Sequence, residues 1–234
     1  MQAAFEFVGS AILFDMDGTL IDSTLCVERQ WRRWAQRHGL DAEKILAVAH
    51  GRRNAETIRD VAPHLATTEE LARFDEEELT DSDGILAVPG AAELLAGLPE
   101  AAWAVVTSAS RRLAEVRLAA AGLPVPKILV SAGDVTEGKP DPQGYLLAAQ
   151  LIKAAPSLCL VVEDTPSGLE AARAAGMPSL GITTTYRCDQ LGKVPCISDF
   201  KSVLLRFGDR EAKLRIKFLT IGNNSQYDGA NFSI

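Results

Sequence analysis

Two aspartates, Asp15 and Asp17, stand one residue apart, shortly after the apolar residues 11–13. An apolar run without polar alternation is typical of a strand buried on both faces of a parallel sheet, and ligands bind at the carboxyl ends of such strands. Gly18 next to them allows a turn that a side chain would obstruct. A carboxylate pair at this place could hold a metal ion, but aspartate and glycine are also ordinary turn residues. This stretch alone does not decide between a site and a structural turn.

Other polar groups stand at or near the ends of later apolar runs. They are Thr107, Ser108, Glu163 and Asp164, together with Lys139 in the loop sequence Gly-Lys-Pro-Asp-Pro. Because the carboxyl ends of parallel strands meet at one edge of a sheet, we expect these groups to lie near the first aspartate pair. Four acids in one place repel one another unless a cation lies among them. Oxygen ligands favour Mg²⁺, bound by one or two carboxylates, a substrate phosphate and water.

The periodicity of the chain predicts the elements that position these groups. Beyond residue 85, compact apolar runs alternate with segments of helical spacing. The predicted strands are 103–106, 128–130, 158–162 and 179–182, and the predicted helices are 111–121, 143–154 and 167–175. Because most of these strands lack polar alternation, the predicted fold class is α/β: a doubly wound, Rossmann-like parallel sheet with helices on both faces.

The segment 23–85 differs from the rest of the chain because it has helical spacing throughout and no convincing strand. We therefore predict that it is an inserted, all-helical cap domain. Residues 1–22 and 86–234 would then form the α/β core.

The C-terminal segment, 200–234, is a possible strand or hairpin extension of the core. Leu214, Ile216 and Phe218 alternate with basic residues, which predicts a half-exposed strand added in antiparallel fashion at an edge. Turn residues follow it, so residues 231–234 could pair back as a hairpin. The sequence does not indicate what this extension does.

Composition and charge exclude several classes of partner. The 234 residues carry a net charge of −7, which argues against nucleic acid and anionic membranes, since both require a basic surface. A small anionic substrate remains possible because a metal ion can reverse the local field. The chain begins without the features of a signal peptide and has no apolar run long enough to span a bilayer. Four dispersed cysteines then predict a reducing cytoplasm, and the histidines lack zinc-site spacing.

The order of the motifs is more specific than any one of them. Asp-x-Asp-Gly-Thr, Thr-Ser, Gly-Lys-Pro-Asp-Pro and Glu-Asp, with a helical block after the first motif, resemble the haloacid dehalogenase superfamily. The chain is most similar to its phosphatases with a helical cap, especially those for sugar phosphates and glycerol phosphate, over roughly residues 10 to 190. The resemblance implies a Mg²⁺-dependent hydrolase of a small sugar or polyol phosphate, which we expect to be a monomer or a small homo-oligomer.

The resemblance also implies roles for the acids. Asp15 would attack phosphorus and form an aspartyl-phosphate, and Asp17 would be the general acid and then the general base. Mg²⁺ would be bound by Asp15, Asp164 and the backbone carbonyl of Asp17. Glu163 would bind the metal directly or support another ligand.

Thr107, Ser108 and Lys139 would hold the phosphoryl oxygens, with Lys139 offsetting negative charge in the transition state. The alternatives are structural. Lys139 could be a solvated loop lysine, and the two hydroxyl residues could cap the following helix, a function that is compatible with phosphate binding.

The resemblance implies that the substrate is recognised by a connection between cap helices, which here contains His50, Arg52 and Arg53. Arginine suits phosphate and hydroxyl-rich ligands because it presents several donors in a fixed fork. A solvated basic turn is the alternative interpretation for each of these residues.

Two other functions fit the same core motifs. A phosphosugar mutase similar to β-phosphoglucomutase would use the same aspartyl-phosphate but return the phosphoryl group to a sugar. A binding or regulatory protein could keep the fold without the chemistry, although the intact acids and Lys139 argue against it.

Overall fold

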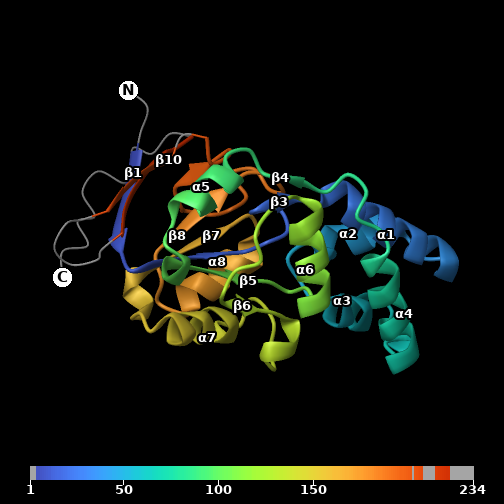
Figure 1. The fold of residues 1–234 in the computed structure, drawn as a ribbon. Helices are drawn as coiled ribbons and strands as arrows, with labels where there is room; N and C mark the ends of the chain where they lie inside the picture. The colour runs from blue at the N-terminus through green and yellow to red at the C-terminus, as the bar shows by residue number, and fades with distance from the viewer. Residues whose placement is uncertain (1–3, 202, 208–213, 222–234) are drawn as a thin grey trace.

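The computed structural model describes residues 4–201, 203–207 and 214–221 (Figure 1). Its centre is a six-stranded parallel sheet with the strand order β6-β5-β2-β7-β8-β9. The strands are β2 (Ala11–Phe14), β5 (Trp103–Val106), β6 (Leu129–Val130), β7 (Cys159–Glu163), β8 (Ser179–Ile182) and β9 (Cys196–Ile197). The four strands predicted beyond residue 85 are present as β5 to β8. The short β9 has no counterpart in the sequence prediction, because two residues are too few to show a period.

Helices cover both faces of this sheet, which confirms the predicted α/β fold class (Figure 1). Alternate side chains of β2 point to opposite faces: Ile12 and Phe14 pack with α5 and α6, whereas Ala11 and Leu13 pack with α7 and α8. All four are fully buried, as expected of a central parallel strand. The helices are α5 (Ala91–Gly97), α6 (Arg111–Ala120), α7 (Gln143–Ile152) and α8 (Pro166–Ala174).

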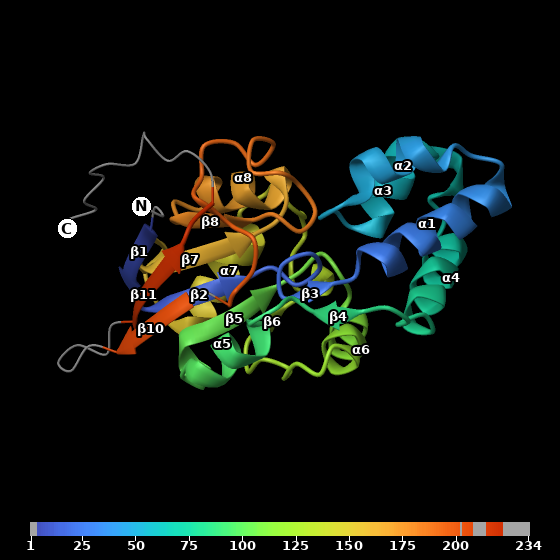
Figure 2. The same cartoon turned by 90° about the horizontal axis from the view of Figure 1, so that it is seen from above.

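Four more helices form a separate group beside the sheet (Figure 2). They are α1 (Thr24–His38), α2 (Ala42–Ala49), α3 (Asn54–Val61) and α4 (Thr68–Leu79), and all lie within the predicted cap segment. The group has a hydrophobic cluster of its own, in which Phe74 packs against Trp31 with ring centroids 4.5 Å apart and planes tilted by 43°, and also packs edge-on against Trp34. Two short antiparallel strands, β3 (Ile21–Asp22) and β4 (Leu86–Ala87), carry the chain into and out of this group.

The predicted C-terminal strand is present as β11 (Leu214–Leu219), but its place differs from the prediction. It is the middle strand of a three-stranded antiparallel sheet, between β1 (Ala4–Gly9) and β10 (Val203–Phe207). The apolar side chains of β11 are buried against the face of the core that also holds Phe14, so this sheet covers the core rather than extending its edge. The predicted hairpin at 231–234 lies outside the described residues. Among those residues, no helix is long and apolar enough to cross a membrane.

We call the group formed by α1 to α4 the cap. Its aromatic cluster predicts that the stability of the cap depends on the packing of Phe74. Phe74→Ala removes a fully buried ring that joins α4 to α1, and we expect it to lower the free energy of unfolding by about 3–5 kcal/mol. Urea denaturation followed by tryptophan fluorescence measures this loss. Leu25→Ala, an exposed position on α1, is the control and should stay within about 0.5 kcal/mol of the parent protein. A loss for Phe74→Ala no larger than that of the control would contradict the prediction.

Candidate active site

A buried lysine joins two acids at the carboxyl edge of the sheet. Nζ of Lys139 donates to Oδ1 of Asp15 at 2.5 Å, to Oε1 of Glu163 at 2.6 Å and to the carbonyl of Val106 at 3.2 Å. Asp15 follows β2, and Glu163 ends the neighbouring strand β7, so the sheet places both acids side by side. Burial alone would lower the pKa of Lys139, but the charges of Asp15 and Glu163 outweigh it and raise the pKa well above its usual value. Lys139 is therefore a buried residue paired with two acids and not a solvated loop residue.

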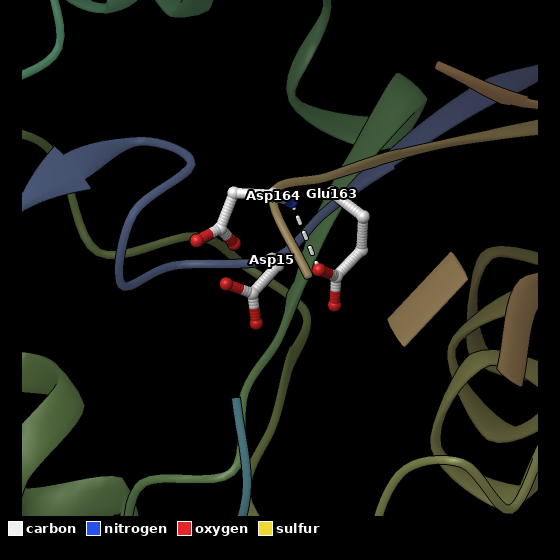
Figure 3. A group of neighbouring side chains, drawn as sticks. All are labelled: Asp15, Glu163 and Asp164. Carbon is white, nitrogen blue, oxygen red and sulfur yellow. Dashed lines mark hydrogen bonds between the residues drawn. The ribbon is translucent and has the colours of Figure 1, made fainter. Parts of the chain in front are cut away.

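Protein donors occupy both carboxylate oxygens of Glu163. Oε1 accepts from Lys139 and from the hydroxyl of Tyr145. Oε2 accepts from the backbone N–H of Asp164 (Figure 3), from that of Thr165 and from the Thr165 hydroxyl. A Cβ at Gly168 would lie 1.7 Å from Oε1, so only glycine leaves room for this carboxylate. The contacts of Glu163 thus fix Lys139 and the start of α8, which fits a supporting role better than direct binding of a metal.

Asp164 lies next to Asp15 and has fewer protein partners. Its Oδ1 accepts from the hydroxyl of Thr19 at 3.1 Å. Gly18 has φ +79°, a conformation that favours glycine, and a Cβ there would lie 2.0 Å from Oδ2 of Asp164. Both the backbone conformation and the lack of space therefore require glycine at this position of the first motif.

The acids of the site fit a divalent cation. Carboxylate oxygens of Asp15, Glu163 and Asp164 all lie within 4.8 Å of one another, and Lys139 contacts only the first two of these acids. Burial raises the pKa of Asp15 to about 7, and burial together with the charges of Glu163 and Asp15 raises that of Asp164 well above its usual value. A cation bound by oxygen ligands would offset this excess negative charge. Asp15 and Asp164 are the side chains best placed to bind it.

Asp17 points toward the cap side of the site. Its Oδ1 accepts from the hydroxyl of Ser23 at 2.6 Å and its Oδ2 accepts from Nη1 of Arg117 at 3.0 Å. Arg117 also pairs with Glu78 of α4. Sequence reasoning missed both residues, although each had a signal: each charge lies on the apolar stripe of its helix, where it is four residues from an apolar side chain.

Thr107 and Ser108 follow β5 and line the cavity beside Asp15. The hydroxyl of Thr107 accepts from the backbone N–H of Ala109, and the hydroxyl of Ser108 donates to the carbonyl of Gly51 in the cap. The side chain that caps α6 is that of Ser110. Capping therefore does not account for the first two hydroxyl groups, and Ser108 is a contact between core and cap.

The three cap candidates differ in where they lie. His50 and Arg52 line the cavity that contains Asp15, and this cavity has a volume of about 70 Å³. Arg52 also forms an ion pair with Asp60 at 2.7 Å. Burial lowers the pKa of His50, which favours its neutral form. Arg53 instead donates to the carbonyls of residues 135 and 136 at 3.0 and 2.9 Å, and so ties the cap to the loop that carries Lys139.

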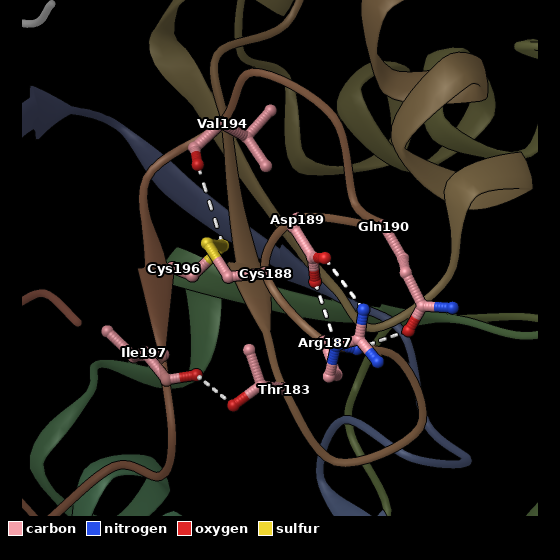
Figure 4. The surroundings of a disulfide bond; sticks show 8 residues. All are labelled: Thr183, Arg187, Cys188, Asp189, Gln190, Val194, Cys196 and Ile197. Carbon is pink, nitrogen blue, oxygen red and sulfur yellow. Dashed lines mark hydrogen bonds and ion pairs between the residues drawn. A yellow bond between two sulfur atoms is a disulfide. The ribbon is translucent and has the colours of Figure 1, made fainter. Parts of the chain in front are cut away.

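The loop between β8 and β9 lies on another side of the site and holds a disulfide. Cys188 and Cys196 are bonded, with Cα atoms 6.0 Å apart (Figure 4). The prediction of four dispersed thiols is wrong for this pair, because the loop folds back and brings together two residues that form no motif in the sequence. Cys26 and Cys159 are buried free thiols, so only these two still agree with the prediction.

Comparison with known proteins gives consistent matches. Residues 10–176 match the family described as haloacid dehalogenase-like hydrolase. The chain is 42% identical to hexitol phosphatase A of Escherichia coli over 190 residues, covering 79% of this chain and 88% of that protein. It is 36% identical to glycerol-1-phosphate phosphohydrolase 2 of Saccharomyces cerevisiae, with 80% of each chain covered. A hydrolase from Pseudomonas syringae superposes with a TM-score of 0.72 and 28% identity, covering 82% of this chain and 94% of that one.

The buried acids predict that stability depends on pH and on metal. Burial raises the pKa of Asp15 from 3.8 to about 7. In the cation-free protein, the contribution of Asp15 to the free energy of unfolding is therefore complete below pH 3.8 and is lost as the pH rises through about 7. A divalent cation binds the deprotonated acids, so Mg²⁺ should raise the melting temperature more at pH 8 than at pH 5.5. At a hundredfold excess over Kd the gain is about 2.7 kcal/mol, or roughly 5–10 °C for a chain of this size.

Thermal melts with EDTA and with Mg²⁺ at the two pH values measure this difference. Asp164→Asn removes one of the two proposed ligands and should abolish most of the Mg²⁺-dependent rise at pH 8. An equal rise at both pH values, or a full rise in the variant, would contradict the assignment of the metal site.

Proposed function

The chain belongs to the haloacid dehalogenase-like hydrolases, and we propose that within this family it is a Mg²⁺-dependent phosphatase of a small sugar or polyol phosphate. The observation that carries the proposal is the carboxylate of Asp15, which Lys139 holds at the end of β2 beside Asp164. A nucleophile, a fixed cation and a carboxylate able to bind a metal, all at one sheet edge, are what phosphoryl transfer to a carboxylate needs.

In the first step Asp15 would attack the phosphorus atom of the substrate. Lys139 fixes Oδ1, so Oδ2 would form the new bond to phosphorus while the bond to the leaving alcohol breaks. Asp17 would give its proton to the departing oxygen. Lys139 would offset the charge on the phosphoryl oxygens, and the hydroxyls of Thr107 and Ser108 would orient them.

In the second step Asp17 would act as the base. It would take a proton from water, whose oxygen attacks phosphorus and breaks the bond to Asp15. Phosphate leaves, the Asp15 carboxylate is restored, and Asp17 is again protonated, so the cycle can repeat.

Asp15, Asp164 and the backbone carbonyl of Asp17 would hold the metal, while Glu163 would keep Lys139 and the start of α8 in place. When bound, Mg²⁺ would screen the repulsion between the Asp15 carboxylate and the incoming phosphate. The donor set, which consists of oxygen atoms only, supports Mg²⁺ over softer metals.

The cap would select the leaving group. The cavity beside Asp15 is also lined by cap residues that offer polar contacts and one aromatic side chain, which suits a short polyol. These residues are Trp31, His50, Arg52 and Asn54. The cavity is small, so the cap would close around the substrate and exclude water during phosphoryl capture. Arg53 would support this arrangement by holding the Lys139 loop. We further propose a cytoplasmic location, where small phosphorylated metabolites are found; the Cys188–Cys196 bond would then be a disulfide in a reducing compartment, where such bonds are rare.

The nucleophile assignment predicts that Asp15→Asn lowers kcat by about 10⁴-fold or more, since the amide keeps the shape of the side chain but cannot be phosphorylated. Release of inorganic phosphate from glycerol phosphate in the presence of Mg²⁺ measures the loss. Asp189→Asn, an exposed aspartate on the β8–β9 loop, is the control and should keep activity within about twofold. Near-parental turnover by Asp15→Asn would reject the mechanism.

Incubation with a hexose 1-phosphate separates the phosphatase from a mutase that uses the same aspartyl-phosphate. We expect free phosphate and free sugar, because the phosphoryl group goes to water. Formation of the 6-phosphate without free phosphate would identify a mutase, and no reaction of this or any other phosphomonoester would favour a binding protein.

A further inference from the structure

One arginine links the core to the cap through two charges. Arg117 lies on the buried face of α6 and is 4% exposed. Its Nη1 donates to Oδ2 of Asp17 at 3.0 Å, and its Nη2 donates to Oε1 of Glu78 at 2.9 Å. Asp17 follows the central strand, whereas Glu78 belongs to α4 of the cap and is itself 4% exposed. One guanidinium group therefore bridges the two parts of the molecule.

The bridge continues on both sides of Arg117. Oδ1 of Asp17 accepts from the hydroxyl of Ser23 at 2.6 Å, so both oxygens of this carboxylate are held. Oε2 of Glu78 accepts from Nδ2 of Asn54, the first residue of α3, at 2.6 Å. The orientation of the Asp17 carboxylate thus depends on contacts that reach two helices of the cap.

Stability alone gives little reason for this arrangement. Buried ion pairs lose in desolvation about as much as they gain in attraction, and an apolar replacement is often equally stable. Nε of Arg117 is also buried without a hydrogen-bond partner among the described residues. The effect of Arg117 on its two acids explains its presence better than a contribution to folding.

We propose that Arg117 is a positioning residue that orients the carboxylate of Asp17 for proton transfer to the leaving alcohol and, through Glu78, makes this orientation depend on the position of the cap. The inference rests on the proposed function, in which Asp17 is the general acid. A cap movement that displaces Glu78 would change how the guanidinium group is shared between the two acids. The cap would then control proton transfer as well as access to the site.

The same two helices provide a matched control. Arg112 of α6 pairs with Glu76 of α4 at 2.8 Å, but both side chains are more than half exposed. This second pair also crosses from core to cap, yet it does not touch Asp17. Exposed ion pairs contribute little, so its removal should leave catalysis unchanged.

The test compares two leaving groups in the full-length protein with Mg²⁺. Glycerol phosphate releases a poorly acidic alcohol that needs a proton, whereas 4-nitrophenyl phosphate releases a phenolate that does not. For Arg117→Gln we expect kcat/KM to fall about 10²-fold or more with glycerol phosphate and less than about tenfold with the aryl ester, since a positioned general acid contributes 10²–10⁴. Arg117→Lys should recover part of this loss, and Arg112→Gln should stay within about twofold on both substrates.

A second variant, Glu78→Gln, is tested in the same way and also serves if Arg117→Gln does not fold. It should lower activity on glycerol phosphate selectively, and the double variant should lose no more than Arg117→Gln alone because both act through one contact. Equal losses on the two substrates, additive losses, or no loss would overturn the inference while leaving the phosphatase assignment intact. Absence of hydrolysis of either ester by the parent protein would instead reject the proposed function, and the inference with it.

Discussion

The contact between Lys139 and the acids Asp15 and Glu163 is the constraint on which the rest of the site depends. An ammonium group removed from water is tolerable only between anions, and the anions are tolerable only beside a cation. Adjacent parallel strands supply the two acids at fixed spacing, and apolar side chains fill both faces behind them. The fully buried strands β2 and β7 thus fix the positions of Asp15 and Glu163 more firmly than an exposed, flexible loop would.

The buried charges form two groups with different charge balance. The inner group consists of Lys139 and the acids around it, and the outer group consists of Arg117, Asp17 and Glu78. Asp15 and Glu163 contact Lys139 and Asp164 lies beside them, so three acids and one lysine leave an excess of negative charge that a bound cation would offset. Around Arg117, two acids share one guanidinium group, and Asp17 keeps part of its side chain open to solvent. On the proposed function, the inner group would hold a metal and a phosphoryl group, whereas the outer group would adjust if the cap moved.

The sequence predicts what is local and misses what depends on assembly. Asp15 and Asp164 follow apolar runs whose ends parallel topology brings together, whereas Lys139 is indicated by the loop motif Gly-Lys-Pro-Asp-Pro. Arg117 and Glu78 were missed because their contact joins two residues that are 39 positions apart in the sequence and lie on different helices. The pairing of Cys188 with Cys196 and the central place of β11 likewise depend on how segments fold back, which spacing alone does not encode.

The position of Arg117 also bears on how one core can serve different substrates. A cap that only closed over the site would affect binding, and its helices could vary without consequence for the acid in the core. Here Glu78 and Asn54, both cap residues, lie in the chain of contacts that orients Asp17. Changes in the cap that alter the choice of alcohol would therefore also alter how readily that alcohol is protonated. If Asp17 is the general acid, the same buried arginine would couple the selection of the leaving group to its departure.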